Sequence, residues 1–232
     1  MLAPSSSSEE PTVLGLIRGR LIVSCQAPDD SPMRETATIA RLARAAVQGG
    51  AGALRINGVD DITAVRGETA LPLIGLIKER GRRRNVITPS DEQVRQLQSA
   101  GADLIAIDAT VEAAGEVGAR VRSATRVSTV PILADVSDFA EGMDAWDAGA
   151  QVVATTLSGY TPYSRQDPSP DLELIRRLAD AGVRVIAEGR FTTPGEVAEA
   201  FSAGALAVVV GSAITDPVSI TRRFAAATPA RR

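Results

Sequence analysis

The chain has 232 residues and a net charge of −3. Its acidic balance argues against nucleic acid as a partner held by bulk charge. The sequence contains no histidine and a single cysteine, Cys25, which excludes a histidine base, an intrachain disulfide and a Cys/His metal site. No acidic cluster has the spacing of a metal site, so we expect no bound metal. Cys25 lies in the apolar run LIVSC, which favours a packed strand residue over a nucleophile.

The N-terminus, MLAPSSSSEE, is polar and rich in serine. It lacks the basic start and apolar core of a signal peptide, and no apolar run reaches the roughly 18 residues of a membrane span. We therefore expect a cytoplasmic protein with no membrane partner. Residues 1–12 are expected to be a disordered tail, and residues 13–232 are expected to form a single domain.

Eight apolar runs follow one another along the chain and are predicted to be strands. Most are apolar throughout rather than alternating, which is typical of parallel strands covered on both faces. They lie at 21–25, 53–57, 73–78, 104–109, 131–136, 152–157, 185–189 and 207–212.

Six segments between or after these runs show helical spacing, with caps or Pro at the start and mostly Gly at the end. They are 35–50, 91–101, 138–149, 170–182, 193–204 and 216–228. Residues 79–90 are expected to form a loop without a full helix. Five glycines precede predicted strands and are expected to adopt the left-handed conformation just past a helix end: Gly52, Gly101, Gly149, Gly182 and Gly204.

The alternation of strands and helices predicts an α/β fold. Eight βα units in about 210 residues fit a (β/α)8 TIM barrel at the small end of its size range. A doubly wound open sheet is the alternative, but eight strands at this spacing favour closure.

Polar side chains stand at or just after the ends of the predicted strands, where barrel enzymes hold their reactive groups. Burying charges there costs free energy unless they are paired, so a convergent set indicates a site. The candidates are Gln26, Arg55, Asn57, Lys78, Asp108, Asp135, Thr155, Thr156, Glu188, Gly211 and Ser212.

Lys78 is the only lysine in a chain that contains 24 arginines. Arginine stays protonated at ordinary pH, whereas a lysine whose pKa is lowered can act as a base or form an imine. A lysine retained at the end of an apolar run therefore indicates chemistry that arginine cannot perform.

Two glycine turns, at Gly189 and at Gly211-Ser212, follow the last two predicted strands. Barrels often bind phosphate at these loops. The polar segment TTLSGYTPYS (155–164) holds both tyrosines, and its Tyr160 is a candidate ligand contact. A sugar phosphate is the simplest ligand class. Two reactions fit a lysine and a glutamate facing it: proton exchange beside a carbonyl, or an imine-forming aldolase reaction.

Several segments of the chain, in the expected order, resemble the N-acetylmannosamine-6-phosphate 2-epimerase family. The members of this family are phosphate-binding TIM barrels. The resemblance covers residues 19–225. Its segments include LPLIGLIK and VIAEGRFTTPGEV, and its unusual strings are SCQA and TTLSGYT. The family interconverts N-acetylmannosamine 6-phosphate and N-acetylglucosamine 6-phosphate in sialic acid and amino-sugar catabolism. It needs no cofactor.

The resemblance implies that Lys78 and Glu188 handle the proton at carbon 2. It also implies that Gln26, Arg55 and Asp135 contact the sugar, and that the phosphate-binding backbone includes Gly189, Gly211 and Ser212. A homodimer is expected, since barrels of this kind often pair. The alternatives to an epimerase are the lysine-imine aldolase and a non-catalytic sugar-phosphate-binding barrel.

Two positions depart from the family's pattern. After the lysine many relatives carry Arg-Asp-Tyr, whereas this chain continues Glu79-Arg80-Gly81 and then three arginines. After GSAIT many relatives have arginine, whereas this chain has Asp216. An acid beside a phosphate is unfavourable unless it points away and caps the next helix. Arg190 or Arg222 would compensate for its charge, and we count Arg190 among the phosphate-binding residues.

Overall fold

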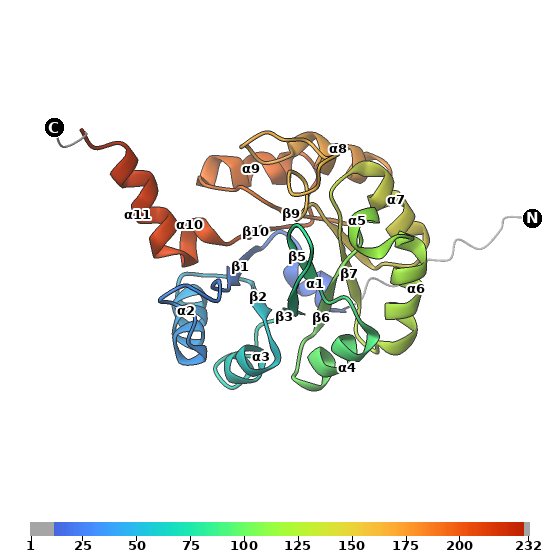
Figure 1. Ribbon diagram of the computed structural model, residues 1–232, viewed down its shortest axis with the longest axis horizontal. Coiled ribbons are helices and arrows are strands. Elements are labelled where there is room, and N and C mark those ends of the chain that lie inside the picture. The colour runs from blue at the N-terminus through green and yellow to red at the C-terminus, as the bar shows by residue number, and fades with distance from the viewer. Residues whose placement is uncertain (1–11, 230–232) are drawn as a thin grey trace, which may run out of the picture.

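Eight parallel strands close into a barrel in the computed structural model, which describes residues 12–229 (Figure 1). The order around the barrel is β1-β10-β9-β8-β7-β6-β3-β2, so the first strand pairs with the last and the sheet is closed rather than doubly wound. All eight predicted strands are present. Their bounds are β1 (Leu21–Cys25), β2 (Ala53–Asn57), β3 (Leu73–Leu76), β6 (Leu104–Asp108), β7 (Ile132–Asp135), β8 (Val152–Ala154), β9 (Val185–Glu188) and β10 (Ala207–Val210).

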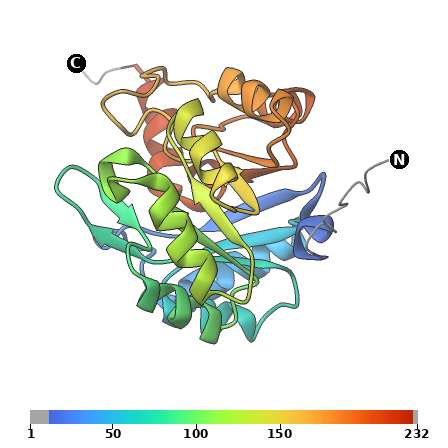
Figure 2. The same cartoon turned by 90° about the vertical axis from the view of Figure 1, so that its right-hand side faces the viewer.

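Helices surround the barrel (Figures 1 and 2). The six predicted ones are α2 (Thr36–Gln48), α4 (Asp91–Ser99), α7 (Phe139–Asp147), α8 (Leu172–Asp180), α9 (Pro194–Ser202) and α11 (Pro217–Ala226). The sequence did not predict α3 (Val59–Arg66), α6 (Val117–Val127), or the short α5 (Val111–Ala114) and α10 (Ser212–Thr215). Reciprocal capping boxes begin α4 and α9, which explains why their starts were recognisable.

A further short helix, α1 (Thr12–Ile17), was not predicted and covers the N-terminal end of the barrel. Its Leu14 and Ile17 are fully buried and belong to the same apolar cluster as the residues that fill the barrel interior. Figure 2 shows α1 at one end of the barrel and the polar loops at the other. The predicted disordered tail, residues 1–12, lies outside the described residues except for Thr12, where α1 begins.

The two-residue period of the strands decides which side chains enter the barrel. Ala53, Leu133 and Ile186 belong to the interior core. Two residues later on the same strands come Arg55, Asp135 and Glu188. Each charged group therefore stands on the interior face, one layer above the apolar filling and close to the carboxyl end of its strand.

The third strand was predicted over residues 73–78, which is too long, because β3 ends at Leu76. The backbone N–H of Thr88 donates to the Ile77 carbonyl (2.6 Å), and the Ile77 N–H donates to Thr88 Oγ1 (3.1 Å). These bonds divert the chain into an antiparallel hairpin of β4 (Lys78–Arg80) and β5 (Asn85–Ile87). Lys78 is thus the first residue of this hairpin rather than the last residue of a barrel strand.

Four of the five glycines expected in the left-handed region have positive φ there, and Gly52 does not. Gly50, with φ 95°, makes that turn instead. Gly52 is required for space, since a Cβ at this position would come within 2.5 Å of the Arg20 Cβ.

Among residues 12–229, no helix combines the length and the apolar character needed to cross a membrane.

Candidate active site

A buried arginine joins two carboxylates across the interior of the barrel. Arg55 donates from Nη1 and Nη2 to the two oxygens of Asp135 (3.1 and 2.6 Å), and Nη1 also donates to Glu188 Oε2 (2.6 Å). The Arg55 and Asp135 side chains are 1% and 0% exposed, and that of Glu188 is 15% exposed. Thr156 completes the cluster by donating to Asp135 Oδ1 (2.5 Å) and lying 3.1 Å from Glu188 Oε2. The arrangement fixes the Glu188 carboxylate in one orientation.

Burial alone would lower the pKa of Arg55, but the carboxylates of Asp135 and Glu188 more than offset that effect, so the pKa is raised. The guanidinium is therefore permanently charged. It can orient and neutralise its partners, but it cannot exchange a proton.

Lys78 reaches the same cluster from the hairpin. The Lys78 side chain is exposed because it borders a cavity. The protein atoms around it nevertheless displace much of the water that would solvate its ammonium group. This desolvation and the charge of Arg55 lower the pKa of Lys78, while Glu188 and Asp135 oppose the shift. The result favours a lysine that gives up its proton more readily than a free one.

Glu188 is perturbed in the opposite direction. Burial raises its pKa and so does the charge of Asp135, against the stabilising influence of Arg55, the Thr156 hydroxyl and Lys78. A lysine with a lowered pKa and a glutamate with a raised pKa lie in one site, and perturbed pairs of this kind mark acid–base chemistry.

The cavity above this cluster has two adjoining lobes, of about 900 and 390 Å³. Five of the residues that the sequence predicted for the site border both lobes: Lys78, Tyr160, Glu188, Gly211 and Ser212. Gln26 borders the wider lobe, and Gly189 and Arg190 border the narrower one. Arg55 and Asp135 lie behind Glu188 rather than among the residues that line the cavity, and their contact with the sugar stays a prediction.

The residues predicted to hold a sugar differ in how firmly they are fixed. Gln26 donates from Nε2 to Ser24 Oγ (2.8 Å), and its Oε1 has no hydrogen-bond partner among the described protein atoms. Tyr160 is 55% exposed and stands over both lobes. Both side chains remain candidates for contact with hydroxyl groups.

The predicted phosphate residues gather at the ends of β9 and β10. Gly189 has φ 116° and Arg190 has φ 63°, so this turn uses the left-handed region twice. The Arg190 guanidinium donates from Nε to the Ser169 carbonyl (2.8 Å) and from Nη1 to the Ser158 carbonyl. Arg190 therefore also holds the segment that carries Tyr160, and its contact with phosphate stays a prediction.

Known proteins share the sequence pattern and the fold of this chain. The sequence pattern of a family described as "Putative N-acetylmannosamine-6-phosphate epimerase" matches residues 39–230. The chain belongs to this family. A relative from Caldanaerobacter subterraneus subsp. tengcongensis, named "Putative N-acetylmannosamine-6-phosphate 2-epimerase", is 44% identical over 91% of this chain and 92% of its own.

Solved structures give the same family. The N-acetylmannosamine-6-phosphate 2-epimerase from Clostridium perfringens superposes with a TM-score of 0.86 and 39% identity, covering 97% of this chain and all of that one. Thiamine phosphate pyrophosphorylase from Pyrococcus furiosus, at 16% identity and a TM-score of 0.60 over 91% and 93% of the two chains, shares the fold alone.

Asp216 follows GSAIT and departs from the family's pattern. It caps helix α11, as expected for an acid that points away from a phosphate. Its carboxylate accepts from the Ser219 N–H (3.1 Å) and from the Ser219 hydroxyl at the start of α11. The hydroxyl bond is the main reason that the pKa of Asp216 is lowered, so it is an anion at neutral pH. It borders the wider lobe, whereas Gly189 and Arg190 border the narrower one, which separates like charges if phosphate occupies the narrower lobe.

Sequence reasoning missed several residues that line this epimerase-family cavity. Arg80, Arg84 and Asn85 come from the hairpin, which had been expected to be a plain loop. Asp29 and Met33 come from the loop between β1 and α2. The run GRRR was visible, but nothing in it indicated which arginine turns toward the barrel. Within the described residues, no group of three or more acidic or cysteine side chains is placed to hold a metal ion.

Cys25 is buried, as its apolar run indicated, and burial raises the pKa of its thiol to about 12. At pH 8 its thiolate population should be about 1,000-fold smaller than that of an ordinary cysteine with a pKa of 9.0.

We expect iodoacetamide to modify Cys25 far more slowly in the folded protein than in urea, as followed by intact-mass spectrometry. Rapid modification of the folded protein would contradict this assignment.

Proposed function

We propose that this chain interconverts N-acetylmannosamine 6-phosphate and N-acetylglucosamine 6-phosphate, in the catabolism of sialic acid and amino sugars, as an isomerase without a cofactor. The observation that carries the proposal is that Lys78 and Glu188 border one cavity and influence each other's charge. Membership of the epimerase family supports the choice of substrate.

The reaction requires one proton to leave carbon 2 and another to arrive on the opposite face. This proton is acidic only when carbon 1 is a carbonyl, so the open-chain aldehyde is the reactive form. One of the two side chains removes the proton and generates an enolate, whose negative charge develops on the oxygen of carbon 1. The other returns a proton from the opposite face. Both shifted pKa values lie in the direction that proton exchange near neutral pH requires.

The surrounding residues have supporting roles in this scheme. Arg55 balances the charge of Glu188, and Asp135 with Thr156 holds both in place. Gln26 and Tyr160 would hold the sugar hydroxyls or acetamido group from the cavity wall. Gly189, Arg190, Gly211 and Ser212 would bind the phosphate in the narrower lobe.

The Lys78→Arg substitution keeps the positive charge but removes the ability to exchange a proton. We expect kcat to fall by about 10²- to 10⁴-fold, the usual contribution of a positioned acid or base. In D₂O the wild-type protein should incorporate deuterium at carbon 2 during turnover, as followed by proton NMR.

The matched control is Arg82→Lys, which exchanges the same residue types at an exposed position on the hairpin and should leave turnover unchanged. Epimerisation by the wild-type protein without any deuterium at carbon 2 would rule out proton exchange. If borohydride trapped substrate on Lys78, the imine-forming aldolase would replace the epimerase.

We further propose that the protein forms a homodimer through its C-terminal helices. Large apolar side chains are exposed on α10 and α11: Ile214 at 44%, Val218 at 40% and Phe224 at 75%. No residue of α11 is buried, and Figure 1 shows this helix extending away from the barrel. A second copy would cover this surface.

A cytoplasmic location stays a prediction.

Replacing Phe224 with Asp places a charge on this surface and should disrupt the dimer. We expect sedimentation to give twice the 24.1 kDa chain mass for the wild-type protein and a value shifted toward 24.1 kDa for the variant. A monomeric wild-type protein at micromolar concentration would contradict the proposal.

A further inference from the structure

The hairpin that carries Lys78 is small for an independent element. Its strands β4 and β5 have three residues each and pair Lys78 with Ile87, Glu79 with Val86 and Arg80 with Asn85. An isolated two-stranded hairpin is at best marginally stable in water. Contacts outside the hairpin must therefore hold it, and with it Lys78.

The base of the hairpin is held by backbone contacts. The Lys78 N–H donates to Asn57 Oδ1 (2.9 Å), and Ile77 and Thr88 exchange hydrogen bonds across the base. Gly81 makes the tight return, where an added Cβ would lie 2.5 Å from the Arg84 carbonyl oxygen. These contacts fix where the hairpin begins, and further along β4 the Glu79 carboxylate accepts from Gln93 Nε2 of α4.

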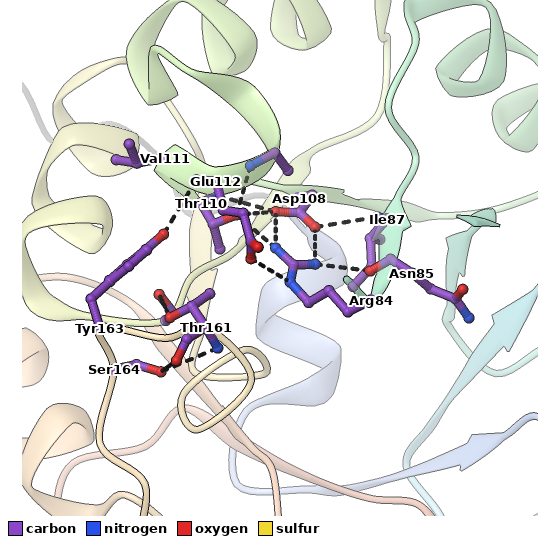
Figure 3. Close-up of polar contacts among 12 residues, drawn as sticks. Arg84, Asn85, Ile87, Asp108, Thr110, Val111, Glu112, Thr161, Tyr163 and Ser164 are labelled. Carbon is purple, nitrogen blue, oxygen red and sulfur yellow. Dashed lines mark hydrogen bonds and ion pairs between the residues drawn. The ribbon is translucent and has the colours of Figure 1, made fainter. Parts of the chain in front are cut away.

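The far end of the hairpin is held by the Arg84 side chain (Figure 3). Its guanidinium donates to both oxygens of Asp108 (2.6 and 3.2 Å) and to Thr110 Oγ1 (2.7 Å). The Arg84 side chain is only 14% exposed, and Asp108 and Thr110 are 2% and 0% exposed. A forked arginine–carboxylate pair has a defined geometry, so this contact fixes direction as well as distance.

The same guanidinium is linked to a second segment through Glu112 on α5. Arg84 Nε donates to Glu112 Oε2 (3.3 Å), and the Glu112 N–H donates to the Tyr163 hydroxyl (3.3 Å). Tyr163 in turn donates to the buried Glu141 (2.8 Å). Tyr163 belongs to the segment that carries Tyr160, so Glu112 links this segment to the hairpin (Figure 3).

We propose that Arg84 is a positioning residue for the reaction: by fixing the hairpin to Asp108 and Thr110, it keeps Lys78 in place opposite Glu188. The proposal rests on the proposed function of Lys78. Arg84 acts through the hairpin, and a misplacement of about 1 Å in a reacting group can cost about 100-fold in rate. A loosened hairpin would also let water reach the Lys78 ammonium and raise its pKa toward the ordinary value.

The test compares Arg84→Met and Arg84→Lys with the wild-type protein and with Arg83→Met, a neighbouring arginine whose side chain is exposed. For Arg84→Met we expect kcat to fall about 10- to 100-fold, with KM changed less than about 3-fold. The limb of the pH–rate profile that belongs to Lys78 should move to higher pH, whether Lys78 acts as acid or as base. Arg84→Lys should be intermediate, and Arg83→Met should match the wild type.

Charge and position must be separated, because several ionisable groups surround Lys78. Those bordering the cavity are Asp29, Asp30, Arg80, Arg84, Glu188, Arg190 and Asp216, with Arg55 and Asp135 behind them. Arg84→Met removes one positive charge from this set, and that loss alone would raise the pKa of Lys78. Arg84→Lys keeps the charge and loses only the fork, so it is the deciding variant.

A direct readout is available because Lys78 is the only lysine of the wild-type chain, and fragmentation of the peptide separates it from the second lysine of Arg84→Lys. The pH dependence of its acylation by acetic anhydride, measured on the Lys78 peptide by mass spectrometry, gives its pKa without any assay of turnover. We expect this pKa to rise in both Arg84 variants relative to Arg83→Met. Urea unfolding of each variant shows that the measurement concerns folded protein.

The proposal is overturned if Arg84→Lys, or any folded Arg84 variant, retains both the wild-type kcat and the wild-type titration of Lys78. It is also overturned if only the stability changes. Should Arg84→Met fail to fold, Arg84→Lys alone decides. A failure of the proposed function would look different: the wild-type protein would not epimerise the sugar phosphates, while the titration of Lys78 would still shift in the Arg84 variants.

Discussion

The ion pairs of Arg55 with Asp135 and Glu188 are the interaction on which the site depends. They join β2 to β7 and β9 across the inside of the barrel, in a place where most neighbours are apolar. Buried pairs of this kind add little net stability, but removing one partner costs about 3–5 kcal/mol because a charge is left uncompensated. Their presence is better explained by what they do for Glu188. They hold its carboxylate at the floor of the cavity while burial keeps its proton affinity high.

Lys78 completes the balance of charge from outside the barrel strands. Arg55 and Lys78 together match Asp135 and Glu188, so the site is close to neutral when all four are ionised. Protonation of Glu188, or loss of a proton from Lys78, changes this balance by one unit of charge. The two proposed reactive groups also come from different kinds of element. Glu188 is fixed by a barrel strand, whereas Lys78 is carried by a hairpin that depends on the contacts of Arg84.

Much of the fold could be predicted because it depends on local patterns. Continuous apolar runs gave all eight strands, and the two-residue period explains why Arg55, Asp135 and Glu188 meet. Lys78 stood out only because the chain uses arginine elsewhere. The hairpin was not predictable, since its three-residue strands carry no periodicity and its fixation depends on Asp108, far away in sequence. Helix α1 was missed because its burial depends on the closed barrel above it.

In the proposed reaction Lys78 and Glu188 serve opposite faces of one carbon atom. The most direct measurement is the exchange of the carbon 2 proton with D₂O by the Lys78→Met protein, using each epimer separately and following the proton by NMR. We expect exchange to persist for the epimer whose proton faces Glu188 and to be lost for the other, with no interconversion. Exchange at both epimers, or at neither, would contradict it.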